Sequence, residues 1–240
     1  MMAATQDDPM VGVGPGDIPD RLARVRRRID DAARATGRDP RDVRLVAISK
    51  FQPLAAVQAA VAAGQSDFGE NRAQELASKL EDAPDGVRWH FVGRLQRNKV
   101  KLVVGRVDLI HSVDRASLAE TVSAQAVGHD IVQRVLVQVD VAGEERKGGC
   151  PPEQVPALLA RIGDLAGVHA DGLMTIPPID SDPAAMFERL RALRARLLPT
   201  FPQLTELSMG MSADLEVAVA SGATIVRVGT AIFGARPRNR

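Results

Sequence analysis

The sequence contains little cysteine, lysine or aromatic residue, and it has no tyrosine. Cys150 is the single cysteine, so the chain can form neither an intrachain disulfide nor a structural zinc site rich in cysteine. No apolar stretch approaches the ~20 residues that a membrane-spanning helix needs. The 31 basic and 30 acidic residues leave a net charge of +1, which gives no electrostatic case for a nucleic-acid partner. These absences predict a cytoplasmic globular protein without a membrane or nucleic-acid partner, and we expect it to be a monomer.

Histidine is also scarce. The four histidines are His90, His111, His129 and His169, and no pair of them has metal-ligand spacing in the sequence. Ligands of a metal ion come in clusters, so we expect no metal site. His90 lies between two aromatic residues, and this position predicts a hydrogen-bonded histidine of the core.

Strand-like and helix-like segments alternate along the chain. After a helical segment at 17–36, strand-like segments lie at 44–49, 66–69, 88–93, 108–113, 133–141, 170–176, 206–209 and 224–228. Helix-like segments lie between them at 53–63, 72–80, 96–104, 115–127, 152–165, 183–198 and 212–220. Eight such repeats in about 250 residues are typical of a closed (β/α)8 TIM-type barrel. An open doubly wound sheet is the alternative, weakened because no glycine fingerprint follows the first strand.

We therefore predict one barrel domain over residues 17–240, with the helix at 17–36 as an N-terminal addition. Residues 1–16 carry Asp7 and Asp8 and have neither the basic start nor the apolar core of a signal peptide. Their glycine and proline content predicts a disordered segment.

Lys50 is the candidate reactive residue. It ends the apolar run at 45–49, whereas Lys79, Lys99, Lys101 and Lys147 lie in polar, helical or loop surroundings. Desolvation at the end of a buried strand would lower the pKa of Lys50 and leave a neutral, nucleophilic amine, as a Schiff-base lysine requires. The alternative is that Lys50 extends into solvent and only aids solubility.

The other strand ends carry a matching set of residues. Active sites of such barrels lie at the carboxyl ends of the strands, and phosphate is often bound after the seventh and eighth. These ends place Glu70 and Asn71 at the rim, and they carry Met174, Ser208, Met209, Arg227, Gly229 and Thr230. A phosphate site opposite a desolvated amine is the arrangement that pyridoxal 5′-phosphate needs.

The chain also resembles a known family. Residues 46–50, 68–71, 89–99, 111–114, 172–174, 207–212 and 226–234 are similar to segments of the pyridoxal-phosphate homeostasis proteins, which look like the N-terminal barrel of alanine racemases without the second domain. The resemblance implies a barrel of fold type III that holds the cofactor as an internal aldimine on Lys50. It also implies that Arg227 faces the pyridine nitrogen and that Asn71 lines the pocket. Ser208, Met209, Gly229 and Thr230 would hold the phosphate. Arg94, Arg97 and Phe51 depart from the usual pattern of the family.

The resemblance favours cofactor homeostasis over turnover. An arginine cannot protonate the pyridine nitrogen, so the ring would be a weak electron sink. Racemisation needs an acid–base group on each face of the substrate carbon, and in the racemases a tyrosine of the other domain is the second one. This chain has no tyrosine. A role in vitamin B6 homeostasis, in which the cofactor is handed on to apo-enzymes, is therefore preferred over a racemase or lyase and over a phosphate-binding barrel without a Schiff base.

One loop has two interpretations. Residues 144–149 are charged and end in two glycines. They predict either a solvated turn or a flexible flap over the mouth of the barrel.

Overall fold

The structure is a computed structural model that describes residues 14–143 and 148–234. Residues 1–13 of the segment predicted to be disordered lie outside this part, as do four residues of the predicted flap. The described chain begins with a 3-10 turn, η1 (Pro15–Asp17), which leads into helix α1 (Ile18–Ala35). The segment that was expected to be disordered ran to residue 16, and its last three residues, Gly14, Pro15 and Gly16, belong to the described part of the chain.

Eight parallel strands form a closed barrel in the order of the chain, which confirms the predicted (β/α)8 architecture and excludes the open sheet. The strands are β1 (Arg44–Ile48), β2 (Asp67–Glu70), β3 (Arg88–Phe91), β4 (Leu109–Val113), β5 (Gln133–Gln138), β6 (Val168–Met174), β7 (Glu206–Ser208) and β8 (Ile225–Val228). Pairing of β1 with β8 closes the barrel and sets Val46 opposite Arg227. The last strand is therefore adjacent to β1, which ends two residues before Lys50.

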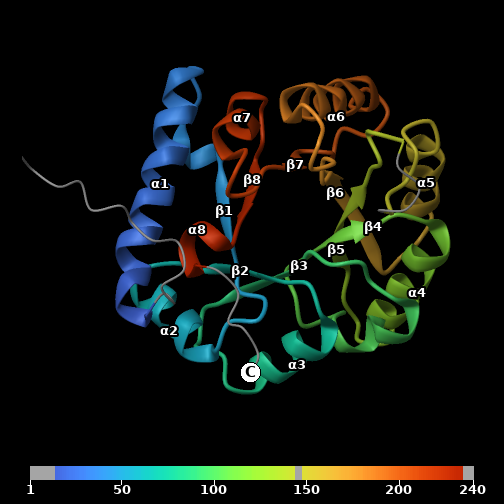
Figure 1. Cartoon of the computed structure of the whole chain (residues 1–240). Helices are drawn as coiled ribbons and strands as arrows, with labels where there is room; N and C mark the ends of the chain where they lie inside the picture. The colour runs from blue at the N-terminus through green and yellow to red at the C-terminus, as the bar shows by residue number, and fades with distance from the viewer. Residues whose placement is uncertain (1–13, 144–147, 235–240) are drawn as a thin grey trace, which may run out of the picture.

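Helices surround the barrel (Figure 1). They are α2 (Leu54–Ala62), α3 (Ala73–Glu81), α4 (Ala116–Val127), α5 (Val155–Gly163), α6 (Pro183–Leu197), α7 (Leu215–Ala220) and α8 (Thr230–Phe233). Helix α1 packs against α2, α7 and α8, and so covers the seam between β8 and β1. A further 3-10 helix, η2 (Pro40–Asp42), joins α1 to β1. Within the described residues, no helix has the length and apolar character needed to cross a membrane.

One predicted helix has a different geometry. Residues 96–104 were expected to form an α-helix, but they contain the 3-10 helix η3 (Arg97–Leu102). The backbone N–H groups of Lys99 and Val103 donate to carbonyls three residues earlier, at 2.9 and 3.0 Å, which is the 3-10 pattern.

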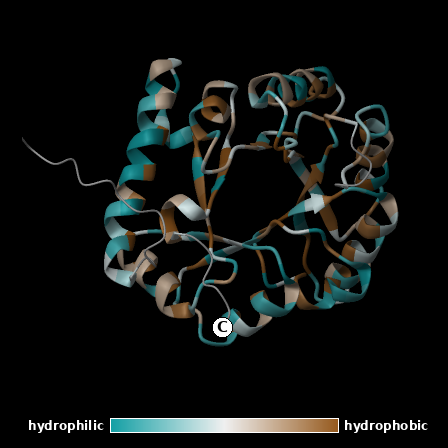
Figure 2. Ribbon diagram, in the orientation of Figure 1, coloured by the Kyte–Doolittle hydropathy of each residue, from teal (hydrophilic) through white to brown (hydrophobic). Residues whose placement is uncertain are grey.

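The core has two layers, because side chains of a strand alternate between the two faces of the sheet. The larger cluster fills the space between the barrel and the helices, and it includes Ala47 and Met209. The smaller cluster lies inside the barrel and consists of Val46, Ile48, Leu109, Leu136, Met174 and Ile225. In Figure 2 the strands of the barrel are mostly hydrophobic, whereas the surrounding helices carry both hydrophobic and hydrophilic residues.

Candidate functional site

A cavity of about 440 Å³ lies at the carboxyl ends of the strands. This volume is within the range of small-molecule sites. Five of the eight residues predicted to bind a cofactor line it: Lys50, Asn71, Arg227, Gly229 and Thr230. Four other polar residues of the wall were not predicted to bind a cofactor, namely Gln52, Arg94, Gln138 and Ser212. The barrel therefore brings most of the predicted site to one place.

The main chain around Lys50 is fixed on both sides. Ser49 donates its N–H to the carbonyl of Gly69 at 3.0 Å, and its own carbonyl accepts from Lys79 Nζ at 2.7 Å. The next N–H, that of Phe51, donates to Glu75 Oε1 at 2.5 Å. Phe51 has a φ of 63°, in the left-handed region where a bulky side chain is uncommon. These contacts hold the base of the Lys50 side chain at the edge of the cavity.

The expectation that Lys50 is the one desolvated lysine is wrong. Lys50 was expected to be the only desolvated lysine, but Lys79 is 8% exposed, whereas Lys50 is half-buried. Helix α3 turns Lys79 inward, where its ammonium contacts Glu70 Oε1 at 2.6 Å and Glu75 Oε1 at 3.0 Å. A lysine on a polar helix was read as exposed because the sequence does not show which carboxylates the fold brings to it.

Glu70 was expected at the rim, and that position is wrong. Its side chain is fully buried on the outer side of β2, where it accepts from Ser49 Oγ and Lys79 Nζ, each at 2.6 Å. Burial raises the pKa of Glu70, and the charge of Lys79 offsets part of that effect. Glu70 therefore supports the backbone before Lys50 and does not face the cavity.

Replacing Lys79 with Met should lower the free energy of unfolding by about 3 kcal/mol near neutral pH, because it leaves the buried Glu70 carboxylate without its cation. Part of the loss should return toward pH 4, where Glu70, whose pKa is raised, takes up a proton and no longer carries a buried charge. Urea unfolding at several pH values measures both effects. The exposed Lys101→Met is the matched control, and equal losses in the two variants would contradict a structural role of Lys79.

Arg227 is buried at the floor of the cavity. Its Nη1 donates to Ser208 Oγ at 2.6 Å and its Nη2 to the carbonyl of Thr175 at 2.8 Å. Burial lowers the pKa of Arg227 to about 10, so the guanidinium keeps its charge at neutral pH. The cavity thus has a fixed cationic donor at its base, one strand away from Lys50.

Gly229 and Thr230 form the wall where β8 leads into α8. A Cβ atom at position 229 would lie 3.2 Å from the carbonyl oxygen of Ile48, so glycine permits this close approach of two strand ends. Thr230 is exposed, and nearby Ser212 accepts a hydrogen bond from the N–H of Ala231 at 3.3 Å. Hydroxyl groups and the first turn of a helix at this edge suit an anionic group.

Three predicted site residues are not among those that line the cavity. Ser208 is buried in the barrel, where its hydroxyl contacts His111 Nδ1 at 2.8 Å as well as Arg227. Met174 packs in the inner core, and the side chain of Met209 packs in the outer core. The period-two alternation of a strand turns Met209 away from the site.

Two of the four histidines lie together inside the barrel, although their sequence spacing gave no sign of a pair. His90 is buried and hydrogen-bonded as expected, with Asp67 Oδ1 3.1 Å from Nε2 and His111 Nε2 3.0 Å from Nδ1. Burial lowers the pKa of His111 well below its usual value, and the nearby His90, Arg227 and Arg44 act in the same direction.

The lowered pKa of His111 predicts a dependence of stability on pH. Below about pH 6.5 a histidine of the unfolded chain binds a proton, whereas buried His111 stays neutral. The free energy of unfolding should therefore decrease as the pH is lowered. His111→Gln should remove its share of this slope, at most about 1.4 kcal/mol per pH unit. Unfolding between pH 5 and 7 measures it, with the exposed His129→Gln as control. An unchanged slope in His111→Gln would refute the assignment.

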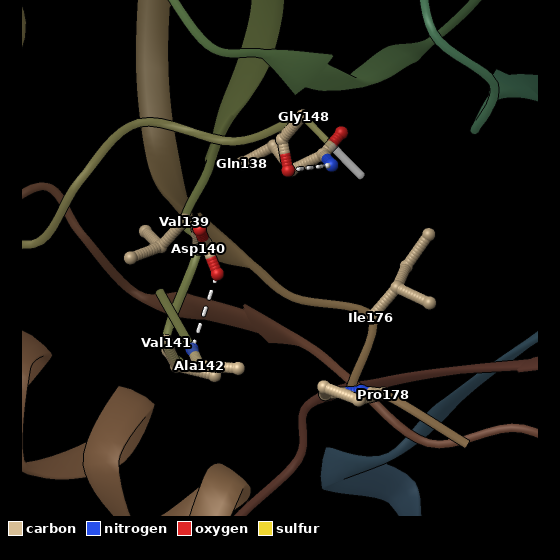
Figure 3. Close-up of a pocket in the computed structure, with 8 residues that line it drawn as sticks. All are labelled: Gln138, Val139, Asp140, Val141, Ala142, Gly148, Ile176 and Pro178. Carbon is tan, nitrogen blue, oxygen red and sulfur yellow. Dashed lines mark hydrogen bonds between the residues drawn. The ribbon is translucent and has the colours of Figure 1, made fainter. Parts of the chain in front are cut away.

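A second, smaller pocket of about 170 Å³ adjoins the cavity at the ends of β5 and β6 (Figure 3). Gln138 and Ile176 line both spaces. Gln138 donates to the carbonyl of Gly148 at 3.3 Å, and Asp140 accepts from the N–H of Ala142 at 3.1 Å. Gly148, near the end of the predicted flap, lines this pocket, whereas residues 144–147 of the flap lie outside the described part of the chain.

The geometry defines a (β/α)8 barrel with a lysine, a buried arginine and a glycine-rich wall around one cavity at its mouth. The model of the alanine racemase N-terminal domain matches residues 21–237. A pyridoxal phosphate homeostasis protein of Pseudomonas aeruginosa is 44% identical over 220 residues, which are 91% of this chain and 96% of that protein. A protein of the same name from Aquifex aeolicus is 45% identical, with 90% and 97% covered.

A solved structure agrees with these relatives. PipY of Synechococcus elongatus, with PLP bound, superposes with a TM-score of 0.79 at 40% identity, covering 90% of this chain and all of PipY. The chain therefore belongs to the alanine racemase N-terminal domain family and, within it, to the pyridoxal phosphate homeostasis proteins.

Proposed function

We propose that this protein binds pyridoxal 5′-phosphate covalently through Lys50 and serves intracellular vitamin B6 homeostasis without turning over a substrate. The observation that carries the proposal is the convergence of Lys50, Arg227 and the Gly229–Thr230 wall on one cavity. The PLP-bound state of PipY and the names of the relatives support the same ligand.

The residues of the cavity fit the cofactor. Asn71 Oδ1 is buried and has no hydrogen-bond partner among the described residues, so it can accept from a ring hydroxyl. Thr230, Ser212 and the close backbone at Gly229 form an edge suited to a phosphate. When bound, the cofactor supplies an aldehyde that condenses with a primary amine, releasing water, and a ring that withdraws electrons. Lys50 is the primary amine that lines the cavity.

The described wall favours binding over catalysis. Arg227 keeps its proton at neutral pH, because its pKa is about 10, and so it does not protonate a ring nitrogen. Among the described residues that line the cavity, Lys50 is the one acid–base group; the wall there has no carboxylate, histidine or thiol, and the sequence has no tyrosine. A racemase needs a second acid–base group. The described part of the cavity wall can therefore hold the cofactor, but it offers one acid–base group where racemisation needs two.

We further propose that the protein acts in the cytoplasm as a monomer and passes the cofactor to apo-enzymes. The open position of the cavity at the barrel mouth supports release to a partner, since it lies at the surface. A PLP-dependent racemase or lyase is the alternative that the family model keeps open.

A turnover assay tests the proposal that the protein does not turn over a substrate. Cofactor-loaded protein incubated with L-alanine or L-serine in heavy water should yield neither D-enantiomer nor keto acid, and deuterium uptake at Cα should remain near that of free cofactor. Chiral chromatography and mass spectrometry measure these products. Rapid exchange that depends on Lys50 would replace the homeostasis proposal with the enzymatic one.

A further inference from the structure

A chain of buried side chains crosses the interior of the barrel below the cavity. It runs from Arg227 on β8 through Ser208 on β7, His111 on β4 and His90 on β3 to Asp67 on β2. Consecutive contacts measure 2.6, 2.8, 3.0 and 3.1 Å. All five residues are buried, and the side chain of Asp67 is 6% exposed. This hydrogen-bonded chain of side chains joins the site to the amino-terminal edge of the barrel.

The far end of this chain is an ionised carboxylate. Burial alone would raise the pKa of Asp67, but hydrogen bonds from His90, Arg88 and Ser66 outweigh burial and hold that pKa well below its usual value. Arg88 contacts Asp67 Oδ2 at 2.6 Å and Oδ1 at 3.0 Å. Asp67 is therefore an acceptor only, and it anchors one end of the chain.

Asp67, which only accepts, and Arg227, which only donates, together set the direction of the hydrogen bonds between them. His90 donates from Nε2 to Asp67, because the carboxylate only accepts, and its Nδ1 accepts from His111. His111, kept neutral by burial, then donates from Nε2 to His90 and accepts at Nδ1 from the Ser208 hydroxyl. Ser208 Oγ in turn accepts from Arg227. Every proton in the chain points from the cavity toward Asp67.

We propose that His111, with His90 and Asp67 behind it, is a positioning residue for Arg227. The chain holds one edge of the guanidinium through Ser208, while the carbonyl of Thr175 holds Nη2. This inference rests on the proposed function, because it assigns Arg227 to the cofactor site. It also commits the hydroxyl proton of Ser208 to His111, so Ser208 orients Arg227 and does not donate to a phosphate.

The surroundings support a positioning role. Inner-core positions at similar levels are apolar, among them Val46, Leu109, Leu136 and Ile225. Polar side chains in such an interior are costly unless each donor and acceptor is satisfied, and a satisfied network specifies one arrangement. Removing one member would leave its neighbours unpaired and release the guanidinium.

Two measurements on cofactor-free protein test the chain. Nitrogen-15 NMR of the histidine rings should show His90 and His111 both protonated at Nε2 alone. Side-chain NMR should show the Arg227 Nη groups rotating slowly and exchanging slowly with water. A doubly protonated His90, or His111 protonated at Nδ1, would overturn the proposal without any variant.

Variants test the link to Arg227. His111→Leu has no polar atoms to join Ser208 and His90, and it should speed exchange of the Arg227 Nη protons at least tenfold. His111→Gln, which can accept from Ser208 and donate to His90, should stay within about threefold of the parent, and so should the exposed His169→Gln. Equal exchange in His111→Leu and His111→Gln would refute positioning, and the tautomers of the parent decide the case if His111→Leu does not fold.

Cofactor binding gives the final readout. If the parent binds pyridoxal 5′-phosphate, His111→Leu should release it at least tenfold faster and shift its absorption band, whereas His111→Gln should resemble the parent. Parent-like release and band position in His111→Leu would overturn the role of the chain at the site. A parent that takes up no cofactor would defeat the proposed function, and the two NMR measurements would still decide whether the chain positions Arg227.

Discussion

Lys50→Ala should keep the fold and lose covalent capture of pyridoxal 5′-phosphate entirely. Lys50 is the one lysine that lines the described cavity, and its neighbours Ser49 and Phe51 are held by backbone contacts that alanine would retain. The visible absorption band of the loaded protein should disappear, and cofactor should wash out during gel filtration. Absorbance at equal protein concentration measures the loss.

Lys101→Ala is the matched control for the Lys50 experiment, because Lys101 is exposed on η3, outside the cavity wall. It should retain the full band. Lys79 is the most informative second lysine, since its amine lies 2.7 Å from the carbonyl of Ser49. A Lys50→Ala protein that still captures the cofactor on Lys79 or another lysine would reject the assignment.

Pyridoxal 5′-phosphate should bind at least ~100-fold more tightly than pyridoxal. Charge-assisted hydrogen bonds contribute roughly 1.5–3 kcal/mol each, so two lost contacts at the edge near Gly229 and Thr230 account for this ratio. Thr230→Val, which keeps the size of the side chain but removes its hydroxyl, should reduce the ratio about tenfold.

Fluorescence or absorbance titration measures both affinities, and Thr200→Val, at an exposed residue after α6, is the control for the loss of a threonine hydroxyl. Equal affinities for the two ligands would show that the phosphate edge is misplaced. An unchanged ratio in Thr230→Val would instead assign the phosphate to backbone N–H groups and Ser212.

The barrel could be predicted from the sequence because strand-like segments, each followed by a helix-like segment, recur eight times along the chain. That pattern placed Lys50, Asn71, Arg227, Gly229 and Thr230 at one end, and the structure gathers all five around the cavity. The eight repeats and their length distinguished a closed barrel from an open sheet.

Contacts between distant strands could not be predicted in this way. The alternation of a strand fixes which residues share a face, but not which partners they meet across the barrel. His90 and His111 are 21 residues apart in sequence and 3.0 Å apart in space, because neighbouring strands place both rings inside. Lys79 is buried because α3 packs its amine against Glu70, and a polar helix gives no sign of that contact.

The sequence did not show which side chains at the end of β7 face the interior of the barrel. Ser208 and Met209 were both assigned to phosphate, yet adjacent strand residues point to opposite faces. Ser208 faces inward to Arg227, and the Met209 side chain packs outward among the helices. Ser212, four residues after Ser208, lies on the cavity wall in the loop that follows β7.

The most direct test of the account is the position of the covalent bond in the parent protein. Purified protein is loaded with pyridoxal 5′-phosphate, reduced with borohydride, digested, and mapped by mass spectrometry. We expect one reduced phosphopyridoxyl group per chain, carried by Lys50. No fixed adduct, or an adduct whose main site is a lysine other than Lys50, would contradict it.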